Sequence, residues 1–352
     1  MRKDIVLEQG GTLEEELALT VVPRDIFRKH RDRFNIFIVS KHPEVWSGNR
    51  YVSQVLEHHQ DAIKLPKVSE YSSGDKHMLQ VQLLIAQEAL KDYHIDKLIL
   101  TEFRPHFRLK PADAALRPGL EQITRGCPYW VIHNGWSMDN SIKSWDNRKF
   151  NNLVRNISSN NPLKFLQLSV DITERNSKIE HALPLCNELP IRTVMWLIQH
   201  AHGVITTSGF FSHAAAAMGK PCIVIAGSSI SKALNAYDSD NIERWAADTP
   251  DKYADLTKSL MPQLYHTGKG CSEKPCGNMT LNKDQPCAKV VEPKMYDEKS
   301  PSMPQATCMY SIELKDILKE VNEYEEAMAS IGYDAVDAAI DNVLSTLKGD
   351  NE

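Results

Sequence analysis

Several features that mark other classes of protein are missing from this sequence of 352 residues. No apolar run approaches the roughly 18 residues that a transmembrane helix needs. The longest run, residues 222–226, has the length of a strand. The first residues also lack the apolar segment of a signal peptide. We therefore expect a cytoplasmic protein without a membrane span.

There is no excess of positive charge either. Lys and Arg number 41 against 46 Asp and Glu, which gives a net charge of −5. Such a surface is unsuited to neutralising phosphates in general, so nucleic acid is excluded as the expected partner. The average composition excludes a disordered, collagenous or disulfide-scaffold chain. The length predicts about two domains, each large enough to bury a core.

Cysteine is scarce, and its odd number of seven, without an export signal, argues against a disulfide framework. Three cysteines fall in segments with core character, and we expect them to be buried thiols: Cys127, Cys186 and Cys222. The other four share one stretch with few apolar residues: Cys271, Cys276, Cys287 and Cys308. Four thiolates suit a tetrahedral structural site for zinc or iron, which would order this stretch. Four free thiols or disulfides are the alternatives.

Residues 1–127 alternate short β-rich runs with helical patterns. Strands are predicted at 5–7, 36–39 and 52–55, helices at 14–30, 78–92 and 112–124, and a further apolar run lies at 98–100. Alternation of this kind predicts a parallel sheet with helices on both faces.

Residues 128–262 repeat the alternation. Strands are predicted at 129–132, 163–168, 203–206 and 222–226, and helices at 148–157, 194–200 and 212–218. Residues 263–309 form the Cys-bearing loop, for which no core element is expected, and residues 310–352 contain amphipathic helices at 311–329 and 335–347. The predicted fold class is therefore α/β, with two doubly wound domains facing a cleft and a ligand at the carboxyl ends of the strands.

A glycine pair and an acidic helix start form the first candidate motif. Gly10 and Gly11 would allow a ligand to approach the backbone closely, and Glu14 or Glu15 could take a proton from an attacking hydroxyl. The alternative is that acids in a first helical turn only complement the helix dipole.

The second motif runs from His133 to Trp136 and on to Lys143 and Trp145, after a strand and before a helix. A Lys in such a loop can supply a point charge to a diphosphate. An exposed Lys beside a packed Trp is the other interpretation.

The third motif contains Thr207, Ser208, Gly209 and His213, and leads into four alanines. Hydroxyl groups and a glycine between a strand and a small-residue helix favour an anion site made from backbone N–H groups and the helix dipole. We expect His213 to donate a hydrogen bond to phosphate there, although a lone His is more often structural.

A basic run ends the first predicted helix: Arg24, Arg28, Lys29, His30, Arg31 and Arg33. Most such runs are solvated faces. The alternative is a docking patch for phosphorylated or membrane-bound acceptors.

Taken together, the three motifs resemble glycosyltransferase family 9, the ADP-heptose:lipopolysaccharide heptosyltransferases. The segment from Gly48 to Val52 is similar to the family's Gly-Asn-Pro-Tyr-Val, and residues 207–221 are similar to Asp-Ser-Gly-x-x-His-x-Ala-Ala-Ala-x-Gly-x-Pro. The family's Ser-Lys-x-Trp-Pro matches Lys143 and Trp145. Three departures stand out. The family's first-domain Asp has no counterpart except Glu14 or Glu15, Thr207 replaces the second Asp, and one extra residue precedes His213.

The resemblance implies a GT-B fold of two Rossmann-like domains, with the acceptor domain at 1–127 and the nucleotide-sugar domain at 128–262. It implies transfer of a heptose or related sugar from an ADP-activated donor to a hydroxyl of a glycan, a lipid-linked glycan or a protein. Glu14 or Glu15 would be the base, and no catalytic metal would be required. The donor-binding residues would be Gly10, Gly11, Lys143, Arg192, Thr193, Met195, Thr207, Ser208, Gly209 and His213, with Arg192 to Met195 beside the nucleotide base.

The Cys-bearing stretch resembles that of an autotransporter-modifying branch of the family, which is similar in holding iron with four cysteines. A homo-oligomer is compatible with the sequence. Two other functions stay open. The first is a non-catalytic GT-B relative that binds a nucleotide sugar or a partner protein, and the absence of the family's two Asp residues supports it. The second is a nucleotide-sugar epimerase.

Overall fold

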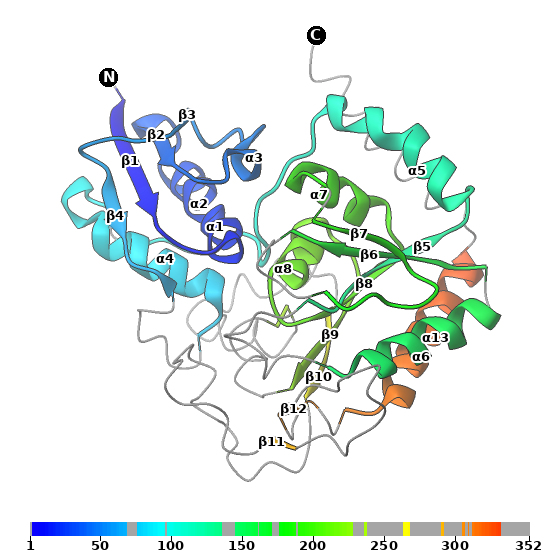
Figure 1. Cartoon of the computed structure of the whole chain (residues 1–352). Coiled ribbons are helices and arrows are strands. Elements are labelled where there is room, and N and C mark those ends of the chain that lie inside the picture. Colours follow the sequence, from blue (N-terminus) through cyan, green and yellow to red (C-terminus); the bar gives the residue numbers. More distant parts are fainter. Residues whose placement is uncertain are drawn as a thin grey trace.

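The computed structural model describes residues 2–68, 76–95, 97–135, 145–160, 162–170, 176–187, 189–227, 236–237, 263–267, 290–291, 305–306, 309 and 312–331. Within these ranges the chain forms two separate parallel sheets flanked by helices (Figure 1), and a short antiparallel pair joins β11 (Val290–Val291) to β12 (Gln305–Ala306). The predicted α/β class with two parallel sheets is confirmed. The four cysteines proposed as metal ligands and the helix predicted at 335–347 lie outside the described residues.

The first sheet has the strand order β3-β2-β1-β4, and all three pairings are parallel. Its strands are β1 (Lys3–Gln9), β2 (Phe34–Val39), β3 (Gln54–Leu56) and β4 (Ile63–Leu65). The helices around it are α1 (Leu13–Leu19), α2 (Val21–His30), α3 (Pro43–Trp46) and α4 (Met78–Ala89). Ile5 and Leu7 on β1 are fully buried, which fixes the sheet's apolar face toward the helices.

One helix predicted at 14–30 is in fact two. The chain breaks at Thr20, whose hydroxyl donates to Leu17 O at 2.6 Å and accepts from the amide of His106 at 2.8 Å. A hydroxyl that takes part in hydrogen bonds to main-chain groups competes with helix continuation. The apolar run at 98–100 is not a strand. Leu98 and Leu100 are buried in the core although their segment pairs with no strand among the described residues.

The second sheet has the order β10-β9-β8-β5-β6-β7 and is parallel throughout. Its strands are β5 (Tyr129–His133), β6 (Lys164–Ser169), β7 (Leu183–Cys186), β8 (Gly203–Thr207), β9 (Cys222–Gly227) and β10 (Gln263–Thr267). The predicted strands and helices of this half are confirmed. Its strands β7 and β10 were not predicted, and neither was β4 of the first sheet.

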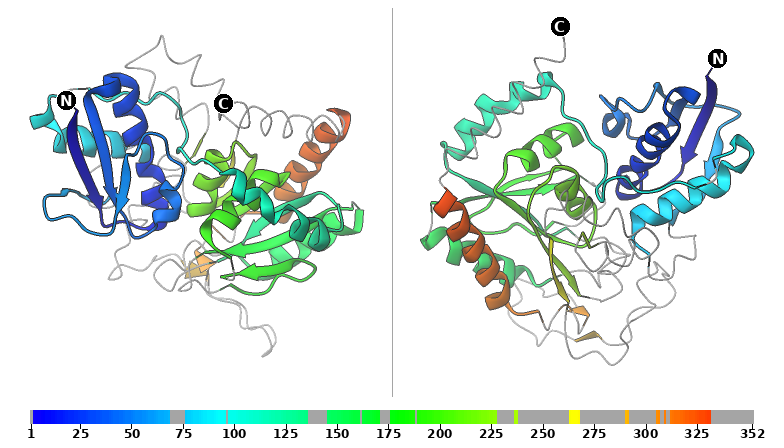
Figure 2. Two further views of the ribbon diagram at one scale, coloured as in Figure 1. Left: turned by 90° about the horizontal axis from the view of Figure 1, so that it is seen from above. Right: turned by 180° about the vertical axis from the view of Figure 1, so that it is seen from behind.

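Helices cover both faces of this sheet. On one face, α7 (Ile191–His200) and α8 (Phe210–Ala217) share an apolar cluster with the first sheet. On the other, α6 (Asn147–Asn160) and α13 (Leu314–Ile331) form a second cluster and lie side by side (Figure 2). Glu325 holds α13 in place, because its carboxylate accepts from Trp130 Nε1 at 2.7 Å and contacts His202 Nδ1 at 3.0 Å.

The chain passes from one sheet to the other through a segment that ends in the 3-10 helix η4 (Pro111–Leu116) and α5 (Arg117–Thr124), where one helix was predicted at 112–124. η4 packs against α7 of the second half, and α1 packs against α8 (Figure 1). The two halves therefore meet at α1 and α8. Of the three cysteines expected to be buried thiols, only Cys222 is fully buried; Cys127 and Cys186 are half-buried.

Candidate active site

The start of α1, directly after the turn from β1, carries two neighbouring carboxylates with different contacts, Glu14 and Glu15. Thr12 is the N-cap of α1 and forms a capping box, in which its hydroxyl accepts from the Glu15 amide at 3.3 Å. The Glu15 carboxylate accepts from the Thr12 amide at 2.9 Å in return. A Cβ on Gly11 would lie 2.6 Å from Glu15 Oε2, so only glycine leaves room for this carboxylate. Glu15 therefore stabilises the helix start.

The turn between β8 and α8 supplies the partner of Glu14. Gly209, at φ 156° and ψ −157°, adopts a conformation essentially restricted to glycine, and it gives α8 no side-chain cap. The alanines that follow are buried, which lets this short helix pack closely on β8. His213 on its first turns is fully buried. The predicted strand, turn and small-residue helix are confirmed as local structure.

Glu14 and His213 meet where the two halves of the chain are in contact. His213 Nε2 lies 3.0 Å from Glu14 Oε1, while His213 Nδ1 lies 2.6 Å from the hydroxyl of Tyr237. The Glu14 side chain keeps 21% of its surface exposed, so its carboxylate borders solvent while its partner does not. A partly exposed carboxylate beside a buried imidazole is a suitable arrangement for proton transfer to and from a bound molecule.

The carboxyl end of the second sheet is held by buried polar side chains. Thr207 and Ser208 are buried, and Thr206 Oγ1 donates to Thr207 O at 2.8 Å. The ring of His133 stacks on Phe211 at 4.4 Å between centroids, and its Nδ1 lies 3.1 Å from Thr206 Oγ1. These contacts fix the start of α8 relative to β5 and β8.

A second polar network continues along this edge. Asn134 donates to Asn147 Oδ1 at 2.9 Å and to Ser177 O at 2.7 Å, and Gln167 donates to Asn134 Oδ1 at 2.8 Å. Trp145 is buried and donates to Ile312 O at 3.3 Å, which makes it part of the core. Lys143 lies outside the described residues. Its expected role at a diphosphate stays a prediction.

Arg192 and Met195, expected beside the nucleotide base, are used by the fold. Arg192 forms an ion pair with Asp113 and donates to Ser47 O at 2.9 Å and to Arg108 O at 3.1 Å. Burial would raise the pKa of Asp113, but hydrogen bonds from Arg192 and from the Lys110 amide outweigh it and lower that pKa. Met195 is fully buried in the core. The geometry therefore gives no support for a base pocket at these two side chains, while Thr193 is half-buried.

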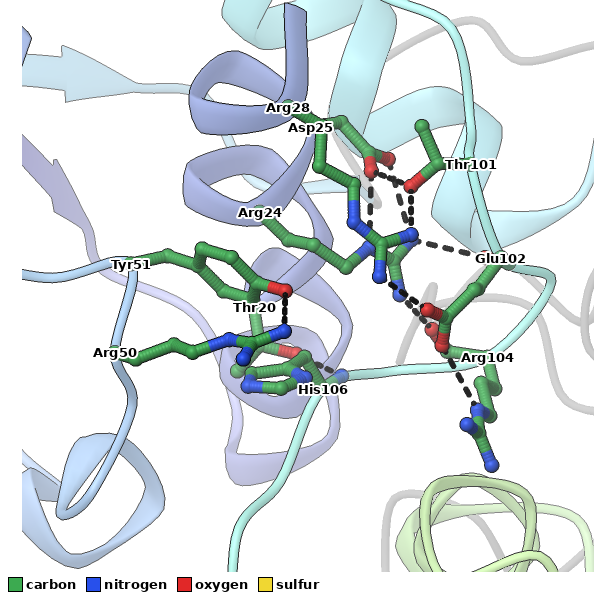
Figure 3. Close-up of polar contacts among 10 residues, drawn as sticks. All are labelled: Thr20, Arg24, Asp25, Arg28, Arg50, Tyr51, Thr101, Glu102, Arg104 and His106. Atoms are coloured by element: carbon green, nitrogen blue, oxygen red, sulfur yellow. Dashed lines mark hydrogen bonds and ion pairs between the residues drawn. The ribbon is translucent and has the colours of Figure 1, made fainter. Parts of the chain in front are cut away.

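The basic run at the end of the first helix is not a uniformly solvated face. Arg24 is fully buried and forms a two-pronged ion pair with Asp25, with nitrogen–oxygen distances of 2.9 and 3.2 Å (Figure 3). It also donates to the main-chain carbonyls of Arg104 at 2.8 Å and Glu102 at 2.9 Å. Arg24 thus anchors residues 102–104, part of the segment that connects the two sheets, to α2. The expectation of a solvated face is therefore wrong for Arg24. The basic run alone did not indicate that Asp25, the next residue, would form a buried ion pair with it.

The surrounding charges shift two titrating groups in this cluster. Burial would raise the pKa of Glu102, but the hydrogen bond from Arg28 and the charges of Arg24 and Arg104 lower it to about 2. Burial lowers the pKa of His106 to about 4, and the nearby guanidinium groups contribute in the same direction. His106 is therefore a neutral ring at pH 7.

Sequence reasoning missed Tyr237, His77 and Phe103, which lie around His213. Tyr237 packs against His77 at 4.8 Å and against Phe103 at 5.6 Å between ring centroids. No motif marks any of the three, and they come from distant parts of the chain. Only the tertiary structure brings them together.

Comparison with known proteins agrees with this architecture. The structure is similar to a family 9 glycosyl transferase from Veillonella parvula and to ADP-heptose LPS heptosyltransferase II of E. coli. Both matches have a TM-score of 0.54 and 10% identity over 93% of this chain, and cover 98% and 100% of those chains. E. coli heptosyltransferase WaaC with ADP gives a TM-score of 0.51 at 8% identity, over 91% of this chain and 99% of that one. No curated protein matches by sequence.

The two parallel α/β units therefore share the overall fold of these glycosyltransferase structures. The sequence model of glycosyltransferase family 9 (heptosyltransferase) matches residues 62–261, more than half of the chain. The chain belongs to this family, and it is a glycosyltransferase. The non-catalytic and epimerase alternatives gain no support from the family match. Among the described residues, no helix is long and apolar enough to cross a membrane.

Proposed function

We propose that this glycosyltransferase moves a heptose from an ADP-activated donor to a hydroxyl group of its acceptor. The observation that carries the proposal is the contact between Glu14 and His213, which joins the glycine-rich turn of the first half to the family motif of the second. Each side chain comes from a segment that resembles a functional motif of the family.

The donor would bind against the carboxyl end of the second sheet. Its diphosphate would lie at the start of α8, near Ser208, Gly209 and His213, where backbone N–H groups and the helix dipole favour an anion. Lys143, which precedes α6 in the sequence, would add a positive charge. Thr207 is buried beneath this turn and would support it rather than supply the acid found there in other family members.

The acceptor would approach over Gly10 and Gly11 toward Glu14. Gly10 is exposed, and a Cβ placed on it meets no atom within 4 Å, so the turn presents open space to a ligand. The acceptor oxygen would form a bond to the anomeric carbon as the bond from that carbon to the diphosphate breaks. Its proton would pass to Glu14, and ADP would leave with the bonding electrons. Hydrogen bonds from His213 and the α8 amides would stabilise the charge that develops on the diphosphate without an obligatory metal.

The direct test is release of ADP from ADP-heptose in the presence of glycan, lipid-linked glycan and protein acceptors, with UDP-sugars as control donors. We expect ADP release that depends on one class of acceptor. ADP binding without release in the presence of any acceptor would contradict transfer of heptose, and release only from a UDP-sugar would contradict the donor.

Lys143→Gln provides a second test, for which Lys149 offers a matched control. Lys149 donates to Ile312 O at 2.8 Å and lies over the Trp145 ring, so its task is structural. We expect Lys143→Gln to raise the KM for the donor or to lower kcat by at least roughly tenfold, the value of one charge-assisted hydrogen bond. Lys149→Gln should leave both constants near those of the unchanged enzyme. Equal effects of the two substitutions would contradict the role of Lys143.

A further inference from the structure

Tyr237 touches both halves of the protein beside the proposed active site. Its side chain is buried, its hydroxyl lies 2.6 Å from His213 Nδ1, and its ring packs against His77 and Phe103 of the first half. His77 is itself held as the N-cap of α4, where its Nδ1 accepts from the Leu79 amide at 3.2 Å. The Tyr237 ring therefore packs against a histidine whose orientation is set by its own hydrogen bond.

The backbone near Tyr237 is fastened as well. The amide of Gln263, at the start of β10, donates to Tyr237 O at 3.4 Å. The side chain of the same Gln263 donates to Ser212 O at 2.7 Å, directly before His213. One residue thus ties the tyrosine and the first turn of α8 to the same strand, which sets the distance between the hydroxyl and the imidazole.

We propose that Tyr237 is the positioning residue of His213, and that it acts together with Glu14 to fix which ring nitrogen carries the proton. This inference rests on the proposed function, in which His213 Nε2–H faces Glu14 and the donor diphosphate. A neutral imidazole has one donor and one acceptor nitrogen. An ionised carboxylate only accepts, so Nε2 beside Glu14 is the donor and Nδ1 accepts from the Tyr237 hydroxyl.

The fixed tautomer matters because the opposite one is unproductive. With the proton on Nδ1, the lone pair of Nε2 would face the Glu14 carboxylate or a diphosphate oxygen, and no hydrogen bond could form. With Nε2 donating to Glu14, the Tyr237 hydroxyl donates to Nδ1 and adds a second hydrogen bond that favours the same tautomer. The contact with His77 and Phe103 links the tautomer of His213 to the packing of the two halves. The Tyr237 hydroxyl points toward Nδ1 only while its ring packs against the first half.

Tyr237→Phe tests the proposal, and Tyr129→Phe is its matched control. Tyr129 is also buried, and its hydroxyl donates to Leu197 O at 2.7 Å, away from His213. Both variants lose one buried tyrosine hydrogen bond, so their losses of stability should be similar. Only Tyr237→Phe should change the imidazole.

The first measurement is 15N NMR of the full-length protein labelled in its histidine rings, without substrate, with the His213 signals assigned from their absence in His213→Gln. We expect an acceptor-type Nδ1 and a donor-type Nε2 in the unchanged protein and in Tyr129→Phe, and a mixture of tautomers in Tyr237→Phe. Unchanged His213 signals in Tyr237→Phe would overturn the proposal. So would two donor-type nitrogens in the unchanged protein at neutral pH, because an imidazolium has no tautomer to fix.

The second measurement is kinetic. We expect Tyr237→Phe to lower kcat roughly tenfold to a hundredfold, with little change in the KM of the acceptor, which corresponds to a buried acceptor left without its partner. Tyr129→Phe should retain its kcat, and an equal fall in both variants would overturn the positioning role. Absence of any sugar transfer by the unchanged protein would contradict the proposed function alone, since the NMR measurement decides the link between Tyr237 and His213 without a substrate.

Discussion

His213 Nε2 lies 3.0 Å from Oε1 of Glu14, although 199 positions separate the two residues in the sequence. The contact links α8 of the second sheet to α1 of the first, and it is the point where two independently predicted motifs meet. The Glu14 carboxylate is partly exposed, whereas the imidazole that it contacts is fully buried. This relationship is the basis for proposing Glu14, and not Glu15, as the base.

Replacing Glu14 and Glu15 one at a time separates catalysis from helix capping. We expect Glu14→Gln to lower the rate of ADP release by about 10² to 10⁴, the usual contribution of a general base. Glu15→Gln keeps a side chain that can still reach the Thr12 amide, so it should lose less than about 1 kcal/mol of stability and most of its rate should remain. Steady-state kinetics and urea unfolding of both variants give the two quantities. A normal rate in Glu14→Gln, or a larger loss in Glu15→Gln, would show that the assignment is wrong.

Arg24 gives a prediction about stability. Arg24→Met leaves the buried Asp25 carboxylate without its cation and removes the donor of two main-chain carbonyls. Breaking a buried pair in this way costs about 3–5 kcal/mol, which urea denaturation would measure. The control is Lys91→Met, which breaks the exposed pair of Lys91 with Glu88 and should cost less than about 1 kcal/mol. Similar unfolding free energies for the two variants would rule out an anchoring role for Arg24.

The second sheet could be predicted from sequence because its central strands are buried on both faces. Runs such as Tyr129–His133 and Gly203–Thr207 are buried throughout, and a helical pattern follows each of them. The edge strand Leu183–Cys186 is largely exposed and contains a proline, so neither alternation nor a continuous apolar run marks it. The break at Thr20 depends on His106, a residue far away in the sequence.

The candidate site divides in the same way. The strand, turn and alanine-rich helix that carry His213 could be predicted because each has a local signal in the sequence, whereas the role of His213 stays a prediction. Tyr237 could not be predicted, because its role depends on the position of a second segment and on two rings from the first half. The ion pair of Arg192 with Asp113 could not be predicted either, because only the fold brings the two residues together.

His106 predicts a pH dependence of folding. Burial and the neighbouring guanidinium groups lower its pKa to about 4, against 6.5 for the unperturbed group. Below pH 6.5 the unfolded chain takes up a proton that the folded chain refuses until about pH 4. The free energy of unfolding should therefore fall as the pH decreases through this window, by at most about 3 kcal/mol from this group.

His106→Asn should flatten the decrease between pH 6.5 and pH 4, as measured by urea unfolding at several pH values. His94→Asn is the control, because His94 is exposed and its left-handed backbone conformation suits asparagine. A profile of His106→Asn that parallels those of the unchanged protein and of the control would contradict the effect of burial at His106.

The cysteine-bearing stretch predicts a structural metal. Cys271, Cys276, Cys287 and Cys308 lie outside the described residues, and within the described ones no group of three or more His, Cys, Asp or Glu side chains could hold a metal ion. We expect about one zinc or iron atom per chain by elemental analysis, since four thiolates complete a tetrahedral site. Each Cys→Ser change in the set should lower the metal content, whereas Cys127→Ser should not.

Because a metal bound only to the folded state stabilises it, a strong chelator should lower the Tm of the unchanged protein but not that of a metal-free variant. Substoichiometric metal in the unchanged protein, or equal loss in Cys127→Ser, would refute the site.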